Sequence, residues 1–136
     1  MRDGTFLMKD AGLVAADAAA TVGGSAKIAD LGAGKVEGHM VAEVTAFNVD
    51  NNDELYLIKL QGSSKSDFAD TIEDLAILEL GALETMIGTD TDSVVGTYVL
   101  PFSNERNGTV YRYVRIYTDV TGTVGTGINY TCHLEK

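Results

Sequence analysis

The chain has 136 residues and a formal net charge of −10, which predict one acidic domain with a core that needs no disulfides. A single cysteine excludes an intramolecular bridge and fits a reducing compartment such as a cytoplasm. The acidic balance argues against a nucleic-acid partner, and the chain lacks both a membrane-length apolar run and the apolar region of a signal peptide.

Residues 1–24 form a distinct opening section. Phe6, Leu7 and Met8 can anchor it, and residues 11–20 are rich in alanine. Alanine favours helix, but the run is short and ends at two glycines, so an isolated helix would be marginal. We expect an extended N-terminal arm, with one or two helical turns as the alternative. Such an arm can lie on a neighbouring subunit or form the first edge strand of its own domain.

Short strands separated by turn residues follow this section. Residues 26–34 predict a strand that ends in a glycine turn. Residues 40–47 alternate, so the even-numbered side chains from Met40 to Ala46 are expected to face inward. The Asn- and Asp-rich residues 48–53 predict a turn. Residues 55–61 predict the next strand, with Leu55, Leu57 and Lys59 opposite Tyr56, Ile58 and Leu60.

The second half of the chain continues this pattern. Residues 62–74 are polar, and either a single helical turn forms there or Phe68 and Ile72 pin a loop to the core. Residues 75–81 and 96–102 predict strands, and Pro101 places the second at an edge or a terminus. The Asn107-Gly108 step predicts a tight turn.

The chain closes with two segments rich in β-branched and aromatic residues, 110–120 and 128–134, which flank a Gly- and Thr-rich linker. We expect a closing hairpin. In its first strand Val110, Arg112, Val114, Ile116 and Thr118 share one face, whose apolar members would pack on a second sheet. The other face carries three tyrosines and an arginine, which suit a partly hydrated contact with a partner: Tyr111, Tyr113, Arg115 and Tyr117.

Together these elements predict an all-β protein. The regular turns and the absence of a sustained helical period favour an antiparallel, jelly-roll-like β-sandwich over residues 25–136, preceded by the arm of residues 1–24.

Catalytic and metal-binding patterns are weak. Residues 50–54 could ligate calcium through oxygen atoms, but they lack EF-hand spacing and are more simply a solvated turn. Cys132 and His133 are adjacent on a strand, so their side chains point to opposite faces and would not meet at one site. The glycine-rich stretches match no phosphate-binding motif. Arg106, Arg112 and Arg115 are more simply partners of carboxylates than a nucleic-acid patch. We expect no enzyme activity, no cofactor and no metal.

The order of these features resembles the capsid cement (decoration) proteins of tailed bacteriophages, in particular the family typified by the Bordetella phage cement protein. The similarity covers nearly the whole chain as a series of short motifs: an N-terminal arm, Ile28-Ala-Asp-Leu-Gly-Ala-Gly34, a loop with Ser66-Asp-Phe68, a Pro101-Phe102 strand, and Tyr111-Arg-Tyr-Val-Arg-Ile-Tyr117 with a glycine turn after it.

This resemblance implies a jelly-roll sandwich that binds the outside of an icosahedral capsid and bridges copies of the major capsid protein. It also implies a homodimer or homotrimer, made in the cytoplasm of the host bacterium and located on the exterior of the virion. The expected contact residues are Phe6, Leu7, Met8, Tyr111, Tyr113, Arg115 and Tyr117. The alternative is a carbohydrate- or ligand-binding sandwich module of a phage or bacterial surface structure, against which the absence of tryptophan counts.

Overall fold

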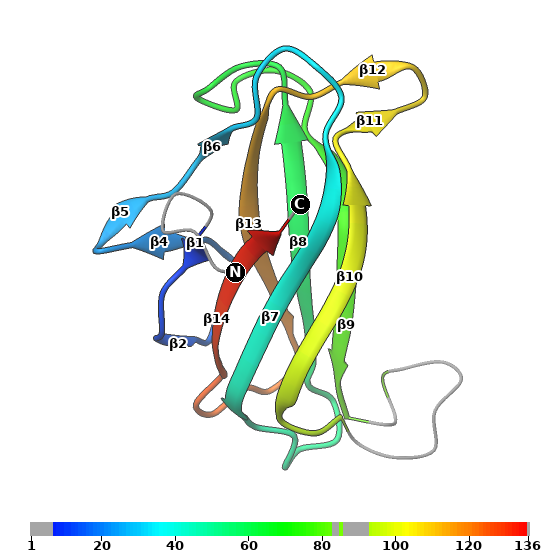
Figure 1. Ribbon diagram of the computed structural model, residues 1–136. Coiled ribbons are helices and arrows are strands. Elements are labelled where there is room, and N and C mark those ends of the chain that lie inside the picture. Colours follow the sequence, from blue (N-terminus) through cyan, green and yellow to red (C-terminus); the bar gives the residue numbers. More distant parts are fainter. Residues whose placement is uncertain (1–6, 83–84, 86–92, 136) are drawn as a thin grey trace.

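A computed structural model describes residues 7–82, 85 and 93–135. Across these residues no α-helix occurs, and the strands form two antiparallel sheets that pack face to face as a sandwich (Figure 1). The predicted all-β sandwich is therefore confirmed. We name the sheets after their central long strands, the β7 sheet and the β8 sheet.

The β7 sheet has the strand order β1-β14-β7-β10, and the short strand β2 also pairs with β14. Its outer strand β10 contains Pro101, which agrees with the edge position predicted from that residue. The bounds of its strands are β1 Leu7–Lys9, β2 Leu13–Val14, β7 Glu37–Phe47, β10 Gly96–Ser103 and β14 Ile128–Glu135.

The β8 sheet has the strand order β3-β13-β8-β9, and β6 also pairs with β13. Its strands are β3 Ala18–Ala19, β6 Ala29–Asp30, β8 Leu55–Ser63, β9 Glu73–Gly81 and β13 Tyr113–Thr121. Two small hairpins complete the fold: β4 Thr21–Val22 with β5 Ser25–Ala26, and β11 Glu105–Arg106 with β12 Thr109–Val110.

These strand orders are those of a jelly roll, because the chain passes repeatedly from one sheet to the other. The last two long strands, β13 and β14, illustrate this crossing. They follow one another along the chain, yet β13 belongs to the β8 sheet and β14 to the β7 sheet. The predicted closing hairpin is therefore wrong: the linker of residues 122–127 joins the two sheets instead of two neighbouring strands.

The alternation predicted for the long strands is confirmed. The inward-facing side chains of both sheets interdigitate as one core, as expected for face-to-face sheets. One predicted member differs: Ala46 is exposed, because a β-bulge in β7 opposite Asn129 and Tyr130 shifts the alternation, and Phe47 packs against the core instead. The largest fully buried apolar side chains are Met8, Met40, Tyr56, Ile58, Leu60, Val114, Ile116, Ile128 and Tyr130.

The described part of the opening section is extended, and it lies on the sandwich of its own chain. We call residues 7–22 the N-terminal strap. Its strands β1 and β2 pair with β14, whereas β3 pairs with β13, so the strap crosses from one sheet to the other along one side of the sandwich (Figure 1). Asp17 Oδ1 accepts a hydrogen bond of 2.7 Å from Val120 N, and Asn129 Oδ1 accepts one of 2.9 Å from Gly12 N.

Lys9 anchors the start of the strap. Its side chain is buried, and Nζ donates to the carbonyl oxygens of Asp10, Gly12 and Tyr130 at 3.0, 3.1 and 2.9 Å. Burial lowers the pKa of Lys9, because desolvation disfavours the ammonium. The same Nζ lies 4.4 Å from the centre of the Tyr130 ring, so the charge also gains a cation–π contact.

The end of the linker between the sheets depends on a glycine. Gly127 has φ +91°, and a Cβ there would collide with the carbonyl oxygen of Val14 in the strap. We therefore expect Gly127→Ala to lower the free energy of unfolding by about 2 kcal/mol or more in urea titrations. Gly125→Ala, in the same linker with open space around it, is the matched control and should change stability by less than about 0.5 kcal/mol. Equal losses in both variants would contradict this packing.

Candidate functional site

The outer face of the β8 sheet carries three of the six described side chains predicted to contact a partner. In β13, Val114, Ile116 and Thr118 are buried in the core, whereas Tyr113, Arg115 and Tyr117 are half-buried and face outward. We call this outer surface the tyrosine face. Its residues continue across neighbouring strands, because side chains directly opposite one another in a sheet share a face.

Three rows of paired residues cross the tyrosine face. Tyr113 pairs with Asp30 of β6 on one side and with Ser63 of β8 on the other. The second row joins Arg115, Gln61 and Asp74. The third row joins Tyr117, Lys59 and Ile77.

Arg115 is held between a loop and its own strand. Its Nε donates to Gln61 Oε1 at 3.0 Å, and the guanidinium carbon lies 4.4 Å from the centre of the Phe68 ring and 5.5 Å from that of Tyr117. Phe68 has φ +55° and is buried beneath the guanidinium, whereas Ile72 is exposed. The predicted loop therefore forms without a helical turn, and Phe68 alone pins it.

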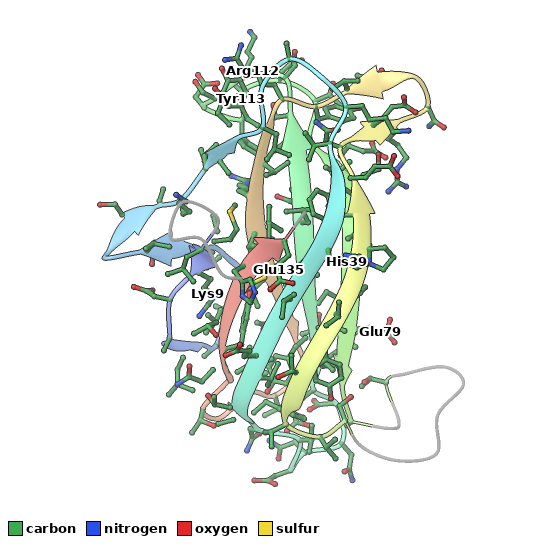
Figure 2. All side chains as sticks on the ribbon, in the orientation of Figure 1. Lys9, His39, Glu79, Arg112, Tyr113 and Glu135 are labelled. Carbon is green, nitrogen blue, oxygen red and sulfur yellow. The ribbon has the colours of Figure 1, made fainter. Side chains whose placement is uncertain are left out.

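Arg112 and Tyr113 lie at one end of the face, where β13 begins (Figure 2). The Arg112 guanidinium binds the Asp30 carboxylate through two hydrogen bonds of 2.7 and 2.9 Å and lies 5.4 Å from the centre of the Tyr113 ring. The hydrogen bonds from Arg112 and from Gly32 N lower the pKa of Asp30. Of the three arginines expected to pair with carboxylates, Arg112 does so; Arg106 donates instead to the carbonyl oxygens of Asp74 and Leu75.

Lys59 lies in the centre of the face between two carboxylates. Its Nζ is 3.6 Å from Asp74 Oδ2 and 3.3 Å from Asp119 Oδ2. Burial opposes the charged form, but the two carboxylates outweigh that effect and raise the pKa of Lys59. The basic groups of this face are thus paired and held in place.

The other predicted contact residues lie elsewhere. Tyr111 is buried in the core against Gly62, because β12 ends at Val110 and the chain turns before β13 begins at Tyr113. Met8 is fully buried, and Leu7 is half-buried at the start of β1. Phe6 lies outside the described residues. Tyr113, Arg115 and Tyr117 are therefore the predicted residues that the structure brings together on one surface.

The acidic turn at residues 50–54 has a structural role that the sequence did not reveal. Glu54 is fully buried, and its carboxylate accepts hydrogen bonds from the backbone N–H groups of Asn51 and Asp53. Asp53 Oδ2 accepts from the backbone and hydroxyl of Thr123, which ties this turn to the linker between the sheets. Within the described part of the chain, no group of three or more His, Cys, Asp or Glu side chains could hold a metal ion.

Cys132 and His133 point to opposite faces of β14, as their adjacency predicted. Cys132 lies in the core, where burial raises the pKa of the thiol to about 12 and Lys9 opposes that shift only in part. His133 Nε2 lies 2.9 Å from Glu135 Oε1. A thiol that stays protonated in the core is a poor nucleophile, so these two side chains form no nucleophilic pair.

A hollow of about 480 Å³ lies beside the strap. Residues 9–21 and Thr118 line it, and most of the lining side chains are small. It contains no aromatic ring against which a sugar could stack, so it gives little support to the carbohydrate-binding alternative.

No protein-family model, curated protein or solved structure matches the chain. Among the residues that the structure describes, no helix is long and apolar enough to cross a membrane.

The Arg115–Phe68 contact should hold the loop of residues 64–72 on the tyrosine face. We expect Arg115→Met to lower the free energy of unfolding by about 1–2 kcal/mol and to accelerate tryptic cleavage after Lys65, which is exposed in this loop. Arg112→Met, which breaks an exposed ion pair just before the same strand, is the control and should leave cleavage at Lys65 unchanged. Unaltered cleavage in Arg115→Met would show that Phe68 holds the loop without the guanidinium.

Proposed function

We propose that the chain is a structural virion protein that binds the outer surface of an icosahedral phage capsid and stabilises it by bridging neighbouring copies of the major capsid protein. The resemblance of its motifs to phage cement proteins suggests this role. The observation that supports it best is the tyrosine face, a regular outward surface built from a central strand of the sandwich.

The composition of the tyrosine face suits a protein partner. Tyr113 and Tyr117 supply apolar area together with hydroxyl groups, a combination that is enriched at protein interfaces. Around β13, Lys59, Arg112 and Arg115 offset Asp30, Asp74 and Asp119, on a chain whose net charge is −10, and Glu79 lies further out on β9. A locally balanced surface can approach an acidic or a neutral partner with little repulsion, while the acidic remainder keeps decorated particles apart.

In this proposal the N-terminal strap supports the sandwich and does not reach a neighbouring subunit through its described residues. Met8 is a core side chain and Lys9 is buried, so substitutions there would test folding before they test attachment. Attachment is therefore assigned to Tyr113, Arg115 and Tyr117.

Co-sedimentation with empty shells of the phage that encodes the chain tests this assignment. We expect the double variant Tyr113→Ala/Tyr117→Ala to bind shells at least about tenfold more weakly, because aromatic anchors dominate protein interfaces. Tyr113→Phe/Tyr117→Phe keeps the rings and should retain most of the binding. Bound protein should also raise the temperature at which the shells disrupt, measured by calorimetry.

The control variant is Val99→Ala, an exposed residue on the outer face of the other sheet, which should bind shells like the wild type. If the tyrosine double variant also binds like the wild type, attachment uses another surface. If the wild-type protein does not bind shells at all, the cement function is wrong, and screening against glycans would test the ligand-binding alternative.

A further inference from the structure

The two sides of the sandwich differ in how their strand edges are covered. The N-terminal strap and β6 pair with β13 and β14 on one side, whereas β9 and β10 form the edges of their sheets on the other. Six large apolar side chains are exposed among the described residues, and only Leu13 belongs to the strap. The others lie on β9 and β10 or just before them: Ile72, Ile77, Val94, Val95 and Val99.

The hydrogen bonds at the ends of β9 show which backbone groups face its free edge. Ala82 N donates to Glu54 O, so even-numbered residues direct their backbone groups toward β8. The backbone groups of Leu75 and Gly81 face away from β8, toward the free edge. Arg106 Nη2 donates to Leu75 O at 3.1 Å, and Ser93 binds both the N–H and the carbonyl of Gly81 at 3.0 Å.

Ile77 and Glu79 lie between these two capped positions. By the same alternation, their backbone N–H and C=O groups face the free edge, and neither residue bonds there to another residue that the structure describes. Their side chains are exposed on the outer face of the β8 sheet, and Figure 2 shows Glu79 beside β9, away from the core. Exposed edge groups of this kind can pair with a strand from another chain.

The edge of β10 is less suited to such pairing. Asn104 N donates to Val36 O beyond the end of β7, so the odd-numbered residues of β10 face its free edge. Pro101 is one of these residues and has no N–H to donate. A proline at an edge position blocks the addition of a further strand.

We propose that β9 pairs with β9 of a second copy of this chain, antiparallel, about a twofold axis that passes through Leu78. In this register Ile77 of each copy lies opposite Glu79 of the other. The N–H and C=O groups of Ile77 in one copy then pair with those of Glu79 in the other copy, so all four edge-facing groups of each chain are bonded. Such a self-complementary set is what a twofold interface requires.

The neighbouring side chains fit the same register. Glu79 lies opposite an isoleucine, so no carboxylate directly faces another. The antiparallel arrangement also brings Ile72 of one copy toward Val94 and Val95 of the other, because Ser93 lies at the far end of β9. A β-bulge at Leu75 bends each strand where the capped Gly81 of the other copy would approach.

The pairing would join the two β8 sheets edge to edge and place both tyrosine faces on the same side of one continuous sheet. If the tyrosine face binds the capsid, as proposed above, the pair would then attach through two sites at once, which raises its avidity. Only this consequence depends on the proposed function; the pairing itself does not.

Analytical ultracentrifugation of the purified full-length protein over a range of concentrations tests the pairing without any shells. We expect a monomer–dimer equilibrium for the wild type. Ile77→Pro removes one edge-facing N–H per copy and should weaken dimerisation by about tenfold or more. Val99→Pro is the matched control, since it removes an edge-facing N–H at an exposed position of β10, and it should dimerise like the wild type.

Amide hydrogen exchange of the wild type gives a second measurement that does not depend on a proline variant folding. The Ile77 and Glu79 amides should exchange more slowly as the protein concentration rises, whereas the Thr97 and Val99 amides should not change. A wild type that stays monomeric, equal effects of the two prolines, or concentration-independent exchange at Ile77 and Glu79 would each overturn the proposal.

Discussion

The closure of the sandwich along β13 and β14 is the constraint on which the rest of the structure depends. These strands lie in different sheets, so no hydrogen-bonded ladder joins them directly. The Tyr130 hydroxyl and Thr118 Oγ1 bridge the sheets at 2.5 Å, and the strap covers this side from outside. Lys9 makes the arrangement cooperative: a buried ammonium is costly without partners, and its third carbonyl partner, Tyr130 O, is in place only when the strap lies against β14.

Using the opening residues to cover one side leaves β9 and β10 as uncovered sheet edges on the other side. The strap supplies backbone partners to β13 and β14, and no described residue supplies such partners at Ile77 and Glu79 on β9. The same asymmetry concentrates the exposed aliphatic side chains near β9 and β10. The free edge and the tyrosine face adjoin one another on the β8 sheet, since Ile77 belongs to the same row as Tyr117. Self-association and attachment can therefore use neighbouring surfaces without competing for one.

Much of this fold could be predicted from local patterns. Alternation fixed the inward faces of β7, β8 and β13, Pro101 marked an edge, and Asn107 with φ +54° begins the tight turn that its pairing with glycine predicted. The assumption that strands adjacent in the sequence pair with each other was wrong for β13 and β14, where the chain passes from one sheet to the other. A Gly- and Thr-rich linker reads as a hairpin turn whether its strands pair with each other or not, and only the whole strand order decides between the two.

The residues of the candidate site likewise divide into those that local patterns could predict and those that they could not. Tyr113, Arg115 and Tyr117 could be assigned to one face because they lie within an uninterrupted strand. Tyr111 could not be assigned in this way. It is odd-numbered like the other three residues, but the break between β12 and β13 turns its ring into the core. The buried roles of Lys9 and Glu54 also depend on distant partners, and a charged residue in a polar stretch carries no local sign that it will be buried.

The tyrosine face is suited to repeated modest contacts because its groups are already held in place. Arg115 is fixed by Gln61 and Phe68, and Lys59 by two carboxylates, so binding would cost little additional side-chain ordering. Paired groups also make fewer new bonds, which limits the affinity of one face. An icosahedral shell offers the same surface many times, so two such faces on one side of a joined sheet would turn modest affinity into stable attachment.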